Sequence, residues 1–295
     1  MAAADDRLFA AIAAGDLTAA RAALAAGADA AAVREFDAAG EREPLRGSES
    51  ALMAAVAVGE LPLVELLLAR GVPLDERDAS SGRTALWMAA AAGALPIVRA
   101  LLAVGADPLL PDGRSGDDPF ATAVAHGHLE VARALREAGA PSSERALRHA
   151  CCRGSRELVV VCLHGRVTLA TAPVLTEAAT SDRAELLEWL STQGADLARE
   201  AGPALVGASH SGSLAAARWL LAHGAPVGWR NEYQWPPLHF AAWGGHMAVV
   251  DALLAAGADP LAACGGGRTA RSWAEEAGHE PIVARLLAAE QGHGG

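Results

Sequence analysis

Two kinds of short apolar segment alternate along nearly the whole chain. An Ala-rich segment of about two helical turns ends at a glycine, and a Leu/Val-rich segment follows it, as in "LVELLLARG" and "VVDALLAAG". The leucine pairs give the second segment one apolar face at helical spacing. The glycine can adopt the left-handed conformation that the end of a helix often requires. The pattern therefore predicts a series of helix pairs.

The helix pairs form an internal repeat. The glycine after the first segment recurs at Gly15, Gly59, Gly93, Gly127, Gly154, Gly212, Gly245 and Gly278. Asp182 takes the same place between Gly154 and Gly212. A glycine before Ala or Val ends the second segment at Gly27, Gly71, Gly105, Gly139, Gly194, Gly224 and Gly257. One pair cannot bury its apolar face alone, whereas stacked neighbours can, so the repeat predicts a solenoid.

Two stretches carry a specific resemblance. "PPLHFAAWGGH" followed by "VVDALLAAGADP", and residues 81–108, resemble the ankyrin repeat. The resemblance implies an all-α ankyrin-repeat solenoid of about nine helix-turn-helix units with short β-hairpin fingers. It also implies that Pro237 opens a helix, that Leu238 enters the core and that His239 braces a finger against the helix. Asp118 stands where the family pattern has Thr and can cap its helix instead.

The resemblance extends over essentially the whole chain, which we expect to be a single ankyrin-repeat domain, residues 1–295. Within it we expect an N-terminal cap unit at 5–30, an inserted charged loop at 31–47, regular units at 48–142 and 201–265, degenerate units at 143–200 and a C-terminal cap unit at 266–295. The end units would cover the apolar faces of the array. The degenerate units match the repeat pattern poorly.

Composition and charge exclude several classes of function. The formal net charge is −11, and the 24 basic residues, all Arg, form no run, so neither nucleic-acid nor anionic-membrane binding is expected. The absence of Lys excludes a Walker-type phosphate loop and a lysine Schiff base. The four cysteines form no C-x-x-C pair. No apolar stretch has the length of a membrane span. Near the N-terminus, Asp5 and Asp6 stand where a secretion signal would carry positive charge. These features favour a cytoplasmic protein with reduced thiols, and the Arg, Ala and Gly bias suggests a bacterial coding sequence.

Histidines and cysteines are the candidate metal ligands. His128, His246 and His279 follow the glycine between two helices, where the ankyrin pattern itself has His, so the resemblance implies that they are structural, as it does for His239. The densest remaining set is His149, Cys151, Cys152, Cys162 and His164. The register places Cys151 and Cys162 in the core, which favours buried thiols over a zinc site. No catalytic motif is present, so we expect neither an enzyme nor a cofactor.

Aromatic residues give the clearest candidate for a binding site. Five of the twelve lie between residues 229 and 243. The register predicts that Phe240 packs inward. The resemblance implies that the other four occupy variable positions on the concave, partner-binding surface: Trp229, Tyr233, Trp235 and Trp243. Exposed Trp and Tyr are typical of interface hot spots. The same columns in other units carry a polar rim: Arg83, Arg114, Asp117, His126, Arg153, His210 and Glu276.

The remaining tryptophans have other expected roles. Trp189 and Trp219 share a column of the second helix, where we expect core packing. Trp87 replaces the pattern histidine, which we expect to cost that unit one hydrogen bond.

The predicted function is a non-catalytic, monomeric module or scaffold for protein-protein interaction. It would bind a protein or peptide on its concave groove, with no nucleic acid, membrane or cofactor. Two alternatives remain open. In the first, the aromatic rings pack on one another and only stiffen a finger. In the second, the chain is an accessory protein whose degenerate units 143–200 form a pocket for a small ligand or metal.

Overall fold

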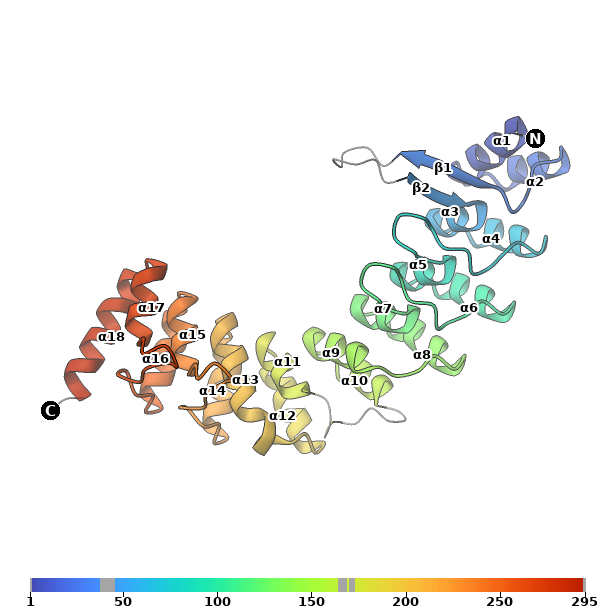
Figure 1. Ribbon diagram of the computed structural model, residues 1–295. Coiled ribbons are helices and arrows are strands. Elements are labelled where there is room, and N and C mark those ends of the chain that lie inside the picture. Colours follow the sequence, from blue (N-terminus) through green and yellow to red (C-terminus); the bar gives the residue numbers. More distant parts are fainter. Residues whose placement is uncertain (1, 38–45, 164–168, 170–172, 294–295) are drawn as a thin grey trace. The chain divides into compact units, whose positions relative to one another are not determined.

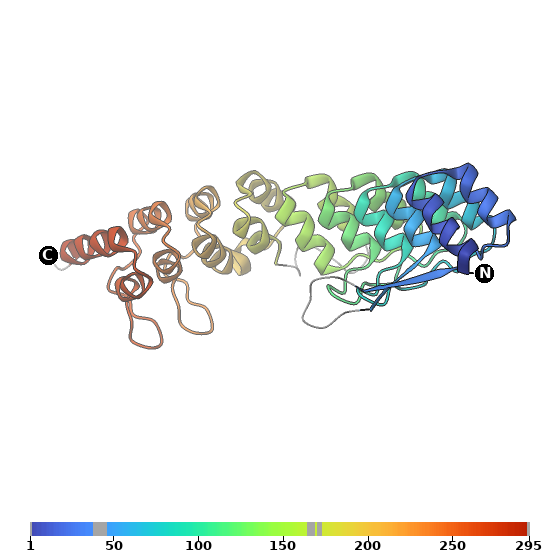
Figure 2. The same cartoon turned by 90° about the horizontal axis from the view of Figure 1, so that it is seen from above.

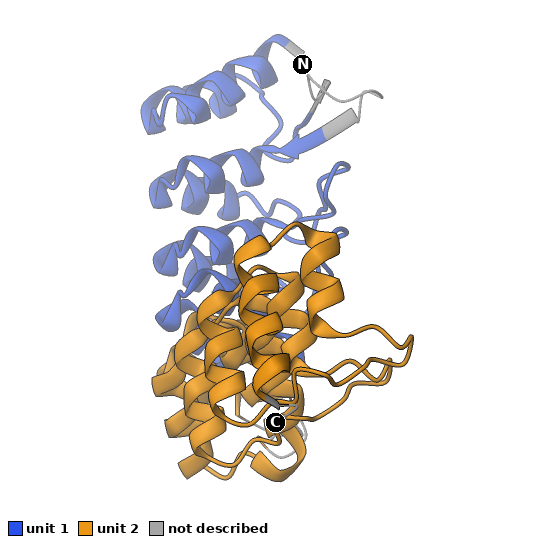
Figure 3. Cartoon of the chain, turned by 90° about the vertical axis from the view of Figure 1, so that its left-hand side faces the viewer, with its two compact units in different colours: residues 1–146 blue, residues 147–295 orange. Residues whose placement is uncertain are grey.

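The structure is a computed structural model that describes residues 2–37, 46–163, 169 and 173–293. These residues form eighteen helices in nine successive pairs (Figure 1), as the sequence predicts. The chain groups into two compact units, residues 1–146 and 147–295 (Figure 3). The prediction of one continuous domain stays a prediction.

The first unit contains four complete helix pairs. The first helices of successive pairs pack on one another, as do the second helices, so two layers of helices enclose the core. Their bounds are α1 Ala2–Ala13, α2 Leu17–Ala25, α3 Ala51–Val58, α4 Leu61–Leu68, α5 Ala85–Ala92, α6 Leu95–Ala103, α7 Pro119–His126 and α8 Leu129–Glu137.

The second unit continues the same scheme. α9, Glu144–Arg153, begins at the border between the units. The helices that follow are α10 Arg156–Cys162, α11 Val174–Thr180, α12 Ala184–Thr192, α13 Leu197–Ser211, α14 Leu214–Ala222, α15 Pro237–Trp243, α16 Met247–Ala255, α17 Ala270–Ala277 and α18 Glu280–His293. Long fingers before α15 and α17 project from the helices on one side (Figure 2).

Local sequence signals explain where the helices begin and end. Gly59 and Gly127 end their helices with φ of 83° and 85°. Asp182 takes the same left-handed conformation, with φ of 54°, which confirms its predicted place in the repeat. At the start of α7, the Asp118 side chain accepts a hydrogen bond from the backbone N–H of Ala121 at 2.7 Å. Asp118 is therefore the helix cap that the sequence predicts.

Three helix pairs are joined to the pair before them by a histidine. Each ring donates its Nε2–H to a backbone carbonyl oxygen that lies two residues before the glycine of the previous helix pair. The bonds run from His128 to Ala91 at 3.0 Å, from His246 to His210 at 3.0 Å and from His279 to Trp243 at 2.9 Å. In other pairs Arg183 and Ser213 donate to the equivalent carbonyl oxygen. The structural role predicted for the three histidines is confirmed.

Side-chain caps hold the finger turns of the first unit. The carboxylate of Asp78 accepts hydrogen bonds from the backbone N–H groups of Ser80 and Ser81 at 2.9 and 2.7 Å. Burial would raise the pKa of Asp78, but the hydrogen bonds from both serines outweigh it and lower that pKa to about 2. The predicted β-hairpin fingers are thus mainly capped turns. Outside β1 and β2, the described chain has one isolated β-bridge, between Ala263 and Thr269.

The insertion at 31–47 departs from the predicted loop. Its described ends form two antiparallel strands, β1 (Val33–Asp37) and β2 (Arg46–Ser50), with Val33 opposite Ser50. Cross-strand pairing of the backbone replaces the irregular structure that its charged sequence suggested. Residues 38–45 of the predicted loop lie outside the described residues.

The degenerate region keeps its helix pairs but loses a finger. α13 starts three residues after Gly194, with Asp196 as its cap. In the first turn of α13, the buried carboxylate of Glu200 accepts a hydrogen bond from the backbone N–H of Leu175 at 2.8 Å. Pro173, which precedes α11, provides no side-chain cap. Glu200 therefore caps α11 from a neighbouring helix, and burial raises the pKa of this carboxyl.

Candidate binding site

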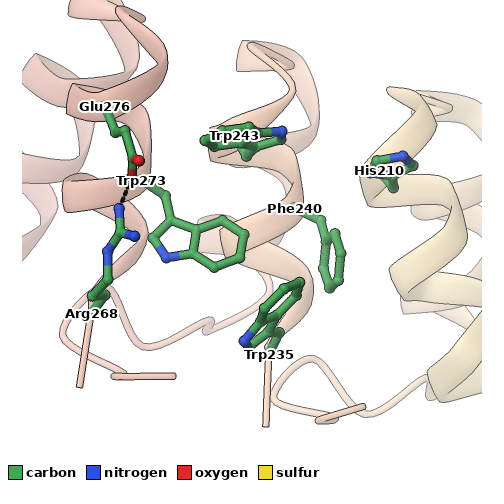
Figure 4. Close-up of a pocket in the computed structure, with 7 residues that line it drawn as sticks. All are labelled: His210, Trp235, Phe240, Trp243, Arg268, Trp273 and Glu276. Atoms are coloured by element: carbon green, nitrogen blue, oxygen red, sulfur yellow. Dashed lines mark hydrogen bonds and ion pairs between the residues drawn. The ribbon is translucent and has the colours of Figure 1, made fainter. Parts of the chain in front are cut away.

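A cavity of about 390 Å³ lies in the second unit, on the side of α15 and α17 that faces the fingers (Figure 4). We call it the aromatic pocket. Its walls come from the end of α13, the finger before α15, α15 itself, the next finger and α17. The lining residues are His210, Trp235, Phe240, Trp243, Arg268, Trp273 and Glu276.

Trp273 is the centre of the ring contacts. Its ring centroid lies 4.8 Å from that of Trp235, 5.9 Å from that of Trp243 and 6.4 Å from that of Phe240, each at a steep interplanar angle. Such edge-to-face pairs contribute about 0.5–1.5 kcal/mol each beyond their burial. The rings therefore fix the shape of the pocket before anything binds to it.

Local structure positions Trp235 and Trp243 at the edge of the pocket. Phe240 and Trp243 are three residues apart on α15 and so share a face. In the preceding finger, the Asn231 side chain accepts hydrogen bonds from the backbone N–H groups of Tyr233 and Trp235 at 3.0 and 2.9 Å. Because this cap orders the turn, Trp235 is held toward α17.

The polar groups of the pocket lie at its edges. Arg268 forms an ion pair with Glu276, and its guanidinium carbon lies 5.8 Å from the ring centroid of Trp273. The ring of His210 meets Phe240 edge-on at 5.8 Å. Behind the pocket, buried His239 donates its Nε2–H to the carbonyl oxygen of Arg268 at 2.9 Å. Burial lowers the pKa of His239, so this ring is held neutral.

Comparison with known families identifies the architecture. A family model described as "Ankyrin repeats (3 copies)" matches residues 8–112 and 52–145, and one described as "Ankyrin repeats (many copies)" matches residues 205–254. The chain belongs to the ankyrin repeat family. The ankyrin repeat domain of human ASB11 is a similar solved structure, with a TM-score of 0.57, 26% sequence identity and coverage of 70% of this chain and 98% of that one. No curated protein matches the chain.

Membership of the family confirms the predicted ankyrin solenoid. Ankyrin repeats are in general protein-interaction modules that carry no catalysis. Among the helices of the described residues, none is both long and apolar enough to span a membrane.

The structure brings four of the predicted site residues of this ankyrin repeat protein together. His210, Trp235, Trp243 and Glu276 all line the aromatic pocket. Tyr233 lies beside it: 60% of this residue is exposed, and its ring centroid is 5.3 Å from that of Trp235. The prediction that these residues bind a partner stays a prediction.

Two aromatic residues differ from expectation. Trp229 does not line the pocket but packs on α13, where a Cβ at Gly202 would lie only 2.3 Å from its indole. Phe240 is half-buried and lines the pocket, whereas the sequence predicts that it packs inward. The inward positions of α15 are taken by its buried neighbours His239 and Ala241.

The rest of the predicted polar rim lies outside the aromatic pocket. Arg83, Arg114, Asp117 and His126 belong to the first unit, and Arg153 is exposed near the start of the second. Asp117 is buried and forms an ion pair with Arg145 at 3.4 Å, which indicates a structural role.

The expected loss of a hydrogen bond at Trp87 is wrong. Its indole Nε1–H donates to the backbone carbonyl oxygen of Asp117 at 3.0 Å. This bond reaches the next finger, as the bond from His239 does. The ring of Trp87 is buried under the guanidinium of Arg83, whose central carbon lies 4.3 Å from the ring centroid. A tryptophan donor thus replaces the histidine donor at the same position.

Sequence reasoning missed Arg268 and Trp273. Trp273 stands four residues after the cap Thr269, as Phe240 stands four residues after Pro236, so the repeat register contained a signal for it. Arg268 follows a glycine-rich turn and carried no such signal.

The second-helix tryptophans are half-buried rather than in the core. The indole Nε1–H of Trp219 donates to a carboxylate oxygen of Glu188 at 2.7 Å, on the exposed side of its helix. A carboxylate at the surface thus satisfies the indole N–H of Trp219.

Two of the three cysteines of the degenerate region lie in the core, and the third, Cys152, is half-buried. Cys151 and Cys162 are fully buried, as their register predicts, and burial raises the pKa of the Cys151 thiol. Within the described parts of the chain, no group of three or more His, Cys, Asp or Glu side chains is placed to hold a metal ion. His164, from the candidate set, lies outside those parts.

Proposed function

We propose that this ankyrin repeat protein binds a protein or peptide segment through the aromatic pocket and the adjoining exposed rings. The observation that carries the proposal is a preformed cavity of about 390 Å³ beside Trp243 and Tyr233, which are 45% and 60% exposed. Large aromatic rings at the edge of a rigid cavity can bury much area on binding at a small entropic cost. Their exposure in the free protein is otherwise unfavourable.

The proposed binder is a non-catalytic, monomeric scaffold that uses no cofactor. In the pocket, Glu276 is paired with Arg268, and the described residues that line the cavity beside His210 include no serine, threonine or cysteine. The net charge of −11 argues against nucleic acid as the partner. None of the four cysteines forms a disulfide, which supports a cytoplasmic location. The Arg, Ala and Gly bias of the sequence supports a bacterial source.

Affinity capture from the source cells tests the proposal. The variant carries Tyr233→Ala and Trp243→Ala, because these two side chains are exposed and their loss should leave the fold intact. A matched control carries Val104→Ala and Leu109→Ala, two exposed apolar residues of the first unit. Circular dichroism checks that all three proteins fold alike.

A partner that wild type and control retain, and that the pocket variant loses, supports the proposal. Its affinity for the purified proteins should fall about tenfold or more in the variant, since hot-spot residues contribute above 1 kcal/mol each. Equal retention by the pocket variant would refute it.

A further inference from the structure

We infer that the aromatic pocket accepts a methylated ammonium group carried by the partner. This inference rests on the proposed function and adds the chemistry of the group that is bound. Four rings surround one space: Figure 4 shows Trp235 and Trp243 on opposite sides, with Phe240 and Trp273 between them. The faces of aromatic rings carry partial negative charge, and Trp attracts cations most strongly.

A cation already lies against one of these rings. The guanidinium carbon of Arg268 is 5.8 Å from the ring centroid of Trp273, and the same guanidinium pairs with Glu276. Arg268 therefore shows which chemistry the pocket accommodates: a positive charge between an indole and a carboxylate. Both partners of the ion pair are about half exposed, so the pair contributes little and can rearrange when another cation arrives.

The hydrogen-bonding capacity of the pocket favours a methylated ammonium over a second guanidinium. A guanidinium brings five N–H donors, whereas Glu276, the one carboxylate among the described residues that line the pocket, is already paired with Arg268. A fully methylated ammonium has no N–H donor and is weakly hydrated, so it loses little when it leaves water for aromatic walls. The net charge of −11 further attracts a cationic partner.

The probe is choline, which carries a trimethylammonium group, and the comparison compound is 3,3-dimethyl-1-butanol, its neutral isostere of the same shape. Both are titrated into the full chain and followed by tryptophan fluorescence, with sodium chloride at equal concentrations as the blank. Choline should bind about fivefold tighter than the alcohol or more, since cation–π attraction distinguishes the two. Trp243→Ala should abolish the signal.

Two charge variants give opposite expected shifts. Glu276→Gln removes the carboxylate and should weaken choline binding about threefold or more, whereas Arg268→Ala frees Glu276 and removes a repelling charge, so binding should tighten by a similar factor. Glu275→Gln is the matched control, because this carboxylate pairs with Arg271 at 2.8 Å and does not line the pocket. It should leave choline binding unchanged.

Other outcomes overturn the inference in distinguishable ways. If the alcohol binds as tightly as choline, the pocket takes neutral apolar groups, such as proline, and the proposed function stands without the cation. If choline binds tighter than the alcohol but both charge variants leave its affinity unchanged, the rings alone select the cation, and the part of the inference that assigns a role to Glu276 and Arg268 is wrong. If neither compound changes the fluorescence, the ammonium inference fails, and the capture experiment with Tyr233→Ala/Trp243→Ala decides separately whether the pocket binds a protein.

Discussion

His239 links the stability of the second unit to pH. Burial lowers its pKa in the folded protein, whereas the unfolded chain has an ordinary pKa of about 6.5. Below about pH 6.5 the unfolded state therefore binds a proton that the folded state does not, and stability falls as pH decreases. We expect the free energy of unfolding, measured with urea, to fall more steeply from pH 7 to pH 5 in wild type than in His239→Gln.

Glutamine is the informative replacement because its amide can still donate to the carbonyl oxygen of Arg268 but does not titrate. Comparing slopes rather than absolute stabilities removes any constant cost of the substitution. Equal slopes in the two proteins would mean that His239 is not the group responsible.

Trp87 is the counterpart of His239 in the first unit, and its indole N–H is the feature to test. Trp87→Phe keeps an aromatic ring but leaves the carbonyl oxygen of Asp117 without this donor. Loss of a buried hydrogen bond costs about 1–3 kcal/mol. We therefore expect the free energy of unfolding of Trp87→Phe, measured with urea, to be lower than that of wild type by about this amount. Trp219→Phe removes a bond to the exposed carboxylate of Glu188 and should cost less; a larger loss there would contradict this account.

At the scale of the helix pair, a glycine at the end of one helix packs closely against a histidine of the next pair. A Cβ at Gly93 would lie 2.5 Å from the ring of His128, and φ at this residue is 71°. Gly105 has a similar left-handed conformation, φ 93°, but nothing within 4 Å. Gly93→Ala therefore combines backbone strain with a clash, whereas Gly105→Ala has the strain alone. Strain of this kind costs about 1 kcal/mol.

Thermal unfolding monitored by circular dichroism measures both variants. We expect Gly93→Ala to lower the melting temperature clearly more than Gly105→Ala, because His128 must move and lose its bond to Ala91. Equal shifts would show that the histidine adapts without cost and that the glycine is needed only for its backbone conformation.

Elements determined by neighbouring residues were predictable from the sequence, and contacts between repeats were not. Helix ends depend on local signals such as Gly127 and Asp118, so their positions followed from spacing alone. Trp229 packs on Gly202, 27 residues earlier, and no local pattern connects the two. Trp273 shares the register of Phe240, yet its role as the centre of the ring contacts depends on rings from two other segments. Three of the seven residues that line the pocket, Phe240, Arg268 and Trp273, were therefore not assigned to it from the sequence.

At the scale of the whole molecule, each compact unit is an array in which a described helix pair contacts mainly its neighbours, so damage should remain local. Leu101 in α6 and Leu253 in α16 are fully buried and occupy the same repeat position, one in each compact unit. Truncating a buried leucine to alanine costs about 2–5 kcal/mol. We expect Leu253→Ala to speed amide hydrogen exchange in α13–α18 and leave α3–α6 unchanged, with the reverse for Leu101→Ala.

Hydrogen exchange with mass spectrometry resolves these segments, and each variant is the control for the other. The result also tests whether residues 1–295 form one continuous domain. If either substitution speeds exchange equally in both units, the chain unfolds as a single cooperative body, and the nearest-neighbour account is wrong. If the effects stay separate, the unit with the aromatic pocket has a stability of its own, and a loss of binding caused by changes in α15 or α17 can be assigned to the pocket without reference to the first unit.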